Sequence, residues 1–233
     1  DPHPKGRHKR FSETVLAGLQ ALSRGAPAEI FSEALAALGP APLHEVARRA
    51  ALPESDLPGV IASLQASGAL VPLEEGPLTP ASSTLVTSRA HWERLADHAT
   101  GEVSASHSAN PLRRGMPREE LKSRLRLQPR LFLALAQKLT AAGHLAGDKT
   151  LVWAPGFEIQ FTPAQQRAVE SFLARLAAAP YASPSVKESE AELGAEVYAA
   201  LLELERLVQV SPEVVFREED YAHLVAETVR MLE

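Results

Sequence analysis

Arginine and lysine side chains gather in the middle of the chain. Residues 113–138 hold eight of them against only Glu119 and Glu120, a net charge of +6. Such cations neutralise phosphates, and phosphate contacts hold a protein on a nucleic acid without reading its sequence. The cluster predicts contacts to the backbone of structured RNA. The candidate phosphate contacts are Arg113, Arg114, Arg118, Lys122, Arg126 and Arg130.

Two other interpretations of this cluster stay open. The cations can form a solvated face, in which Arg118 or Lys122 pairs with Glu119 or with acids of a neighbouring repeat. They can also contact another protein directly. Elsewhere the charge is opposite: residues 185–233 hold twelve acids against four basic residues, a net −8, within a chain whose total is −5. Any nucleic-acid surface is therefore expected in the middle.

Residues that could support catalysis do not form a recognisable set. The chain has no Cys, which excludes thiolate zinc sites and Cys nucleophiles. His91 and His98 are seven apart with no third ligand at a suitable spacing, and His107 is expected to be a turn or capping residue. No Gly-rich phosphate loop or Gly-x-Ser-x-Gly motif occurs. We expect neither an enzyme nor a metal or cofactor site in this chain.

The elements that must position the basic residues can be read from the turn signals. Asn110-Pro111 disfavours helix, Gly115 allows a backbone angle that larger residues resist, and Pro117 suits the first turn of a helix. A short helix is expected over 117–125 and a long one over 131–142, ended by Gly143. The core should contain Leu121, Leu125, Phe132, Leu135 and Leu139.

The same order is predicted on both sides of this segment. On the N-terminal side we expect a helix from Ser12 to Ser23, a second over 27–38 and then a short helix. A long helix that ends at Gly68 and two strands follow. The apolar positions of this long helix are Leu57, Val60, Ile61 and Leu64. On the other side we expect a helix that begins after Thr162, a short helix over 185–193 and a long one over 195–206. A hairpin and a last helix over 218–232 follow.

Short helix, long helix and hairpin make a winged helix-turn-helix. We therefore predict a mainly α fold with small β-hairpins, built as tandem winged helix-turn-helix domains. The expected domains are 1–89 (with a linker over 1–11), 90–158 and 159–233, and the last helix either closes the third or opens a truncated fourth. The long helices of the first and third repeats lack a basic face, which argues against DNA reading by them.

The run from His107 to Leu125 resembles the pattern H-x-x-N-P-L-R-x-G-M-P-R-E-E-L-x-S-R-L of the bacterial selenocysteine-specific elongation factor SelB, in its C-terminal winged-helix region. The matching residues are His107, Asn110 to Arg113, Gly115 to Leu121 and Ser123 to Leu125. The opening DPHPKGRHKR, FTPAQQ at Phe161 to Gln166 and the late DYAHLVAETV also resemble that family.

The resemblance implies a winged-helix fragment of a translation factor. It would link a core that binds GTP, Mg and selenocysteinyl-tRNA to a fourth winged helix that grips the mRNA hairpin at a recoded UGA. The core is expected to be missing because no GTPase motif occurs, and the chain is expected to stop before the fourth winged helix is complete. The implied partners are the ribosome and structured RNA, for a cytoplasmic monomer without membrane contact.

The alternative is a tandem winged-helix regulator that binds nucleic acid, or a protein-interaction scaffold, similar to the factor only in fold. A regulator would normally carry a basic long helix or wing and a dimerising segment. The acidic third repeat counts against that alternative.

Overall fold

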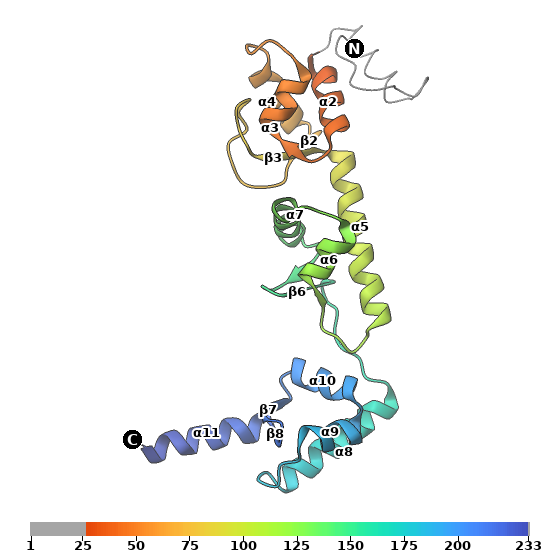
Figure 1. Ribbon diagram of the computed structural model, residues 1–233, viewed down its shortest axis with the longest axis vertical. Helices are drawn as coiled ribbons and strands as arrows, with labels where there is room; N and C mark the ends of the chain where they lie inside the picture. The colour runs from red at the N-terminus through yellow and green to blue at the C-terminus, as the bar shows by residue number, and fades with distance from the viewer. Residues whose placement is uncertain (1–26, 233) are drawn as a thin grey trace. The chain divides into compact units, whose positions relative to one another are not determined.

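The computed structural model describes residues 27–232, and the helices and strands in that range repeat one order (Figure 1). The first repeat consists of α2 (Pro27–Leu38), β1 (Ala41–Pro42), α3 (Leu43–Ala50), α4 (Leu57–Ala66), β2 (Leu70–Pro72) and β3 (Leu85–Ser88). The second consists of α5 (Arg89–Ala109), β4 (Met116–Pro117), α6 (Arg118–Leu125), α7 (Pro129–Ala141), β5 (Ala146–Gly147) and β6 (Leu151–Trp153). The third consists of α8 (Pro163–Ala178), α9 (Val186–Leu193), α10 (Ala195–Glu203), β7 (Leu207–Ser211) and β8 (Val214–Arg217).

This order confirms the mainly α fold with small antiparallel sheets and tandem winged helices. The last helix, α11 (Glu218–Leu232), also has its predicted bounds. The predicted helix from Ser12 to Ser23 and the linker over 1–11 lie outside the described residues.

The chain divides into two compact units, and the division runs through the middle repeat. Of the described residues, the first unit takes 27–102 and 118–147, and the second takes 103–117 and 148–232. The predicted domains 1–89, 90–158 and 159–233 follow the repeats instead. That each repeat is a domain of its own stays a prediction.

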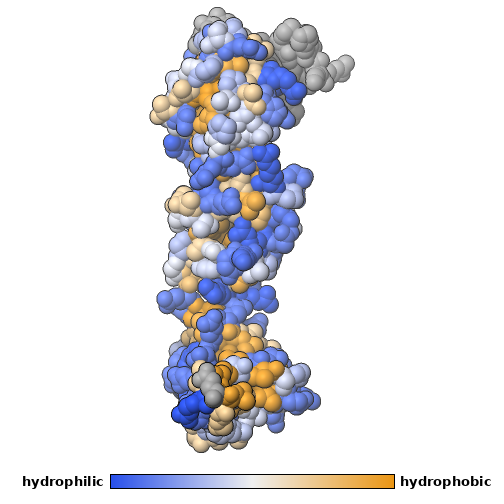
Figure 2. Space-filling view, turned by 90° about the vertical axis from the view of Figure 1, so that its left-hand side faces the viewer, coloured by the Kyte–Doolittle hydropathy of each residue, from blue (hydrophilic) through white to orange (hydrophobic). Residues whose placement is uncertain are grey.

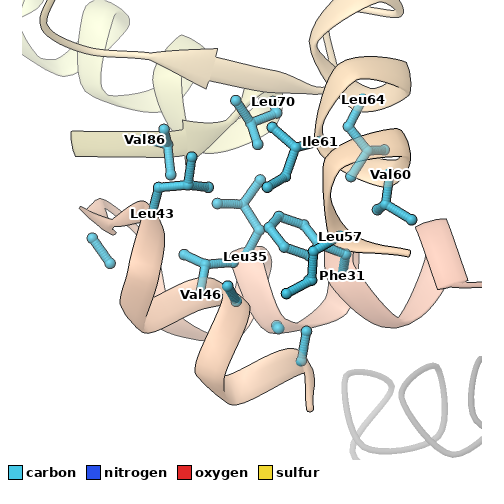
Figure 3. Close-up of a cluster of buried hydrophobic side chains, with 14 residues drawn as sticks. Phe31, Leu35, Leu43, Val46, Leu57, Val60, Ile61, Leu64, Leu70 and Val86 are labelled. Atoms are coloured by element: carbon cyan, nitrogen blue, oxygen red, sulfur yellow. The ribbon is translucent and has the colours of Figure 1, made fainter. Parts of the chain in front are cut away.

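The core of the first repeat lies between three helices and the sheet (Figure 3). The apolar faces of α2, α3 and α4 meet there, against Leu70 of β2 and Val86 of β3. The positions predicted from helical periodicity on α4, which are Leu57, Val60, Ile61 and Leu64, are all buried. Each helix therefore buries the stripe that its sequence indicates.

Two very short strands were not predicted. β1 pairs with β3 through Ala41↔Val86 and Pro42↔Leu85, and β4 pairs with β6 through Met116↔Val152 and Pro117↔Leu151. Pro117, expected in the first turn of a helix, therefore lies in a strand one residue before α6. A strand of two residues has no alternation that a sequence pattern could reveal.

The long helices end on residues with a left-handed backbone. Gly68 and Gly143 have φ of 71° and 72°, which explains why glycine stands at both predicted stops. In the third repeat Glu205 takes this conformation, with φ of 55°. The third long helix, predicted to reach Arg206, ends at Glu203 because the chain turns there, with the Arg206 N–H donating to the Leu201 carbonyl.

Two helices of the third repeat begin with a capping box. α8 begins after Thr162 as predicted, Thr162 and Gln165 cap it, and Ser185 and Glu188 cap α9 in the same way. The core that these helices enclose includes Val169, Phe172, Val197 and Leu201, all buried.

The last helix, α11, differs from the others because it buries no residue. Val225, Val229, Met231 and Leu232 are exposed on it, and hydrophobic surface is visible at the C-terminal end of the second unit (Figure 2). None of the described helices is long and apolar enough to span a membrane.

Candidate nucleic-acid interface

The basic residues on the helix-turn-helix of the middle repeat are exposed or half-buried. Leu121, Leu125, Phe132, Leu135 and Leu139 are all buried, as predicted. On α6, Arg118 lies three residues before Leu121 and is half-buried like Lys122, whereas Arg124 is exposed. Arg126 lies in the turn between α6 and α7, in a left-handed conformation with φ of 54°.

The cations on α6 are paired within their own surroundings. Lys122 forms an ion pair with Glu119 one turn away. Arg124 binds Glu120 at 2.7 Å and Glu102 of α5 at 3.0 Å, and these hydrogen bonds raise the pKa of its guanidinium. Part of the positive charge suggested by the sequence is therefore balanced locally, which matches one of the two alternatives left open.

Arg130, at the start of α7, holds the loop before β3. Its Nη2 lies 2.5 Å from Glu74 Oε1 and donates to the Ser83 carbonyl at 2.8 Å. The same Glu74 oxygen accepts from the Leu85 N–H at 3.0 Å. A phosphate contact by Arg130 would have to compete with this network.

The two remaining predicted phosphate contacts in the first unit, Arg118 and Arg126, differ in environment. Arg118 is half-buried, with its guanidinium carbon 5.8 Å from the centre of the Phe132 ring. Arg126 is exposed and makes no side-chain hydrogen bond or ion pair to any residue that the structure describes. Of the four candidates in the first unit, Arg126 is the one whose charge is best placed for an external phosphate.

The turn at 110–115 is anchored in the second unit. Leu112 is buried in the core of the third repeat, beside residues of α8 and α10. The Arg114 N–H donates to Glu203 Oε2 at 2.7 Å, and the Arg114 guanidinium lies 4.6 Å from the centre of the Trp153 ring. Arg113, between these anchors, is exposed and has no side-chain hydrogen bond or ion pair within residues 27–232.

Gly115 is required for a reason other than the predicted one. Its φ is not in the left-handed region. A Cβ atom there would lie 2.8 Å from the Val152 carbonyl oxygen and 3.3 Å from the Trp153 ring. The glycine therefore permits β4 to approach β6, and a free backbone angle is not its role.

His107 was expected to be a turn or capping residue, and that expectation is wrong. It lies in the last turn of α5, on the buried stripe of Ala96, Ala99 and Val103. Its ring stacks on Phe157 with centroids 3.5 Å apart, and Nε2 accepts from the Ala154 N–H at 3.0 Å. Burial lowers the pKa of His107, which favours the neutral ring that this hydrogen bond needs. The spacing of four from Val103 could have revealed this role.

The six predicted residues fall into two groups. Arg118, Lys122, Arg126 and Arg130 belong to the first unit, and Arg113 and Arg114 belong to the second. His91 and His98 contact Arg94 and Glu102 respectively. Among the described residues, no group of three His, Cys, Asp or Glu could hold a metal ion.

The predicted set does not include the residues that line a hollow in the first unit. Trp92 of α5 and Lys138 of α7 line an open hollow together with Arg89. Aromatic side chains near cations are typical of nucleic-acid sites, and the chain has only two Trp residues, but the approach of Lys138 to Trp92 depends on packing and has no signal in the sequence.

The comparison with family models gives a match in the middle of the chain. Residues 102–152 match the model described as the winged helix of elongation factor SelB. No curated protein matches the chain. The matched segment runs from the middle of α5 to β6 and contains the basic cluster. The chain therefore contains a winged-helix region like that of SelB, over less than a quarter of its 233 residues.

Proposed function

We propose that this chain is the winged-helix connecting part of a selenocysteine-specific elongation factor. It would join the core that carries GTP and selenocysteinyl-tRNA to the domain that grips the mRNA hairpin at a recoded UGA. The observation that carries this proposal is the SelB winged-helix match at 102–152. Support comes from the winged helices on both sides of that segment.

The chain's own contribution is mechanical and electrostatic. GTP and Mg belong to the parent's core, and the proposal assigns no catalytic residue to this chain. The protein acts in the cytoplasm, where ribosomes and structured RNA are its partners. Long helices that lack a basic face, such as α4, fit this role better than DNA reading by a regulator.

Two cations are the preferred phosphate contacts. Arg113 and Arg126 are exposed and lack a carboxylate partner among the described residues, so each can bind a phosphate without breaking an internal ion pair. Arg114, Arg118, Lys122 and Arg130 stay secondary candidates, since their head groups already contact aromatic rings or acids. All six would contact the RNA backbone and read no base.

A selenocysteine-insertion assay tests the role. The complete protein that contains this chain should support readthrough of an in-frame UGA followed by the recoding hairpin. Its coding sequence upstream of Asp1 should encode a GTPase core. Absence of such a core, or readthrough that persists after deletion of the protein, would refute the proposal.

Salt dependence of ribosome binding tests the contacts. Replacing Arg113 and Arg126 with Gln should reduce the slope of log affinity against log salt by somewhat under one unit for each phosphate that is no longer bound. The matched control replaces Lys122 and Arg130 with Gln. It removes the same charge from paired positions and should change the slope less. Equal slopes for wild type and the Arg113/Arg126 variant would refute phosphate contact by these two residues.

A further inference from the structure

An open hollow of about 410 Å³ lies in the first unit, away from the cations of α6. It is lined by Val71, Arg89, Trp92, Lys138, Ala141 and Ala142. These residues come from β2, the first turn of α5, and the end of α7 with the residue after it. The volume falls within the range of about 300–1,000 Å³ that is typical of small-ligand sites.

Trp92 is a half-buried ring with one side supported by the protein. It packs against the cluster of Leu73, Leu85 and Ala134, which joins the hairpin of the first repeat to α7. Lys138 Nζ lies 5.4 Å from the centre of the Trp92 ring. The indole is thus held by its apolar contacts, and the Lys138 ammonium group lies over the ring.

The charge around the hollow is positive. Arg89 Nε donates to the Gly68 carbonyl at 3.1 Å, which orients its guanidinium, and Nη1 lies 3.7 Å from Glu93 Oε1. Lys138 has no ion pair with a carboxylate in the described part of the chain. Two cations and one carboxylate leave a net positive charge beside an aromatic face.

We propose that this hollow binds one unpaired nucleotide of RNA. Its base stacks on Trp92 in place of Lys138 Nζ, and its phosphate lies between Lys138 and Arg89. An aromatic platform with flanking cations suits any single-stranded base, because every base has a π-face. Duplex RNA hides its bases in the stack and cannot offer one to the ring. The choice of RNA over DNA rests on the proposed function.

The two Trp residues of the chain allow a direct test. In a Trp153→Phe variant, Trp92 is the only tryptophan and reports on the hollow by fluorescence. Titration with a single-stranded oligouridylate of about eight nucleotides should quench this fluorescence in a saturable way. A Trp92→Phe variant, in which only Trp153 remains, should show no such quenching. Absence of quenching in the Trp153→Phe variant would overturn the proposal, and so would equal quenching by a duplex of the same length.

Variants of the cations separate the hollow from general electrostatics. Lys138 is half-buried and Arg89 is exposed, and changing either to Glu should weaken oligonucleotide binding at least tenfold more than Lys149→Glu, an exposed control outside the hollow. Trp92→Ala should weaken binding by about 5- to 150-fold, the effect of removing one stacked base. Because Trp92 also packs against apolar neighbours, this variant is accepted only with an unchanged circular dichroism spectrum. Equal effects of Lys138→Glu and Lys149→Glu would overturn the proposal.

These outcomes are distinguishable from failure of the proposed function. Quenching of Trp92 by oligonucleotide does not depend on selenocysteine insertion, and can succeed if the insertion assay fails. Conversely, an active factor whose Trp92 is not quenched would retain its proposed function without this binding site.

Discussion

The middle and third repeats share one backbone plan and carry opposite charge. In the middle repeat α6 and α7 contribute Arg and Lys, whereas α9 and α10 of the third are rich in Glu. Both pairs of helices bury Leu residues at helical spacing and end their long helix on a left-handed residue. The apolar stripe and the turn geometry therefore maintain the fold, and the surface charge can differ without changing it.

Charge alone is a poor guide to that partner. Of the eight cations that make the middle repeat basic, Lys122, Arg124 and Arg130 form ion pairs with acids of their own unit. In the third repeat, the acidic Glu203 accepts from the Arg114 N–H, and Glu192 pairs with Arg175. A binding partner is better indicated by the charged side chains that form no ion pair within the fold.

The largest expected effect is common to both repeats. Leu135 of α7 and Leu201 of α10 are 1% and 0% exposed, so each change to Ala should lower the unfolding free energy by about 2–5 kcal/mol. Denaturant titration measures the loss, with Leu133→Ala at a 52% exposed site as the control. A loss below about half a kcal/mol at either buried site would show that the two cores are not equivalent.

The next effect distinguishes the middle repeat from the third, whose sheet has two strands. Gly115→Ala should destabilise by about 1–3 kcal/mol, since the new methyl group meets the Val152 carbonyl oxygen. Gly101→Ala in α5 is the matched control. No atom lies within 4 Å of its Cβ position, and helix propensity should stabilise the protein by up to about 1 kcal/mol. The same sign of change for both variants in thermal unfolding would contradict this account.

A smaller change in stability, of opposite sign in the two repeats, is expected at the left-handed residues that follow the long helices, Gly143 and Glu205. Gly143→Ala places a Cβ at φ of 72° and should cost about 1 kcal/mol, although the site has open space. Glu205→Gly relieves the same strain in the third repeat and should gain up to about 1 kcal/mol, reduced by the greater chain entropy of glycine. Both are measured by denaturant titration. A gain from Gly143→Ala would refute the equivalence of the two stops.

The smallest effect concerns pH. His107 is neutral when folded and has a pKa below the ordinary 6.5, so the unfolded chain binds the extra proton first. Its contribution to stability is therefore present above pH 6.5 and is lost as the pH falls from there through the folded pKa. In the third repeat, hydrogen bonds from Ser185 lower the pKa of Glu188 from 4.5, so that contribution persists to more acidic pH.

His107→Gln isolates the histidine term, because the amide oxygen can still accept from Ala154 but does not titrate in this range. Unfolding free energy should fall less between about pH 7.5 and pH 5.5 in this variant than in the wild type. Burial and Arg94 also lower the pKa of His91, which adds a loss of the same sign to both proteins. An unchanged pH slope would show that His107 does not titrate on unfolding.

Much of the fold could be predicted from local patterns. The stripe on α4, the caps Thr162 and Ser185, and the stops at Gly68 and Gly143 are each specified by residues close in sequence. The strands β1 and β4 could not, because two residues have no period, and their hydrogen bonds go to strands far along the chain. The left-handed Glu205 also escapes prediction, since glycine is the usual signal for that conformation.

By itself, the sequence determined which residues are apolar at helical spacing, where the turns fall and which segment is basic, because these properties depend on neighbours within a few positions. Only the tertiary structure decided how the basic residues are used. Packing paired Arg130 with Glu74 and Arg124 with Glu102, and it left Arg113 and Arg126 without such partners in the described part of the chain. It also brought Lys138 over Trp92, two residues 46 positions apart in the printed sequence. The physical reason is that a charge's availability depends on which distant groups lie within about 4 Å of it, and only packing sets that distance.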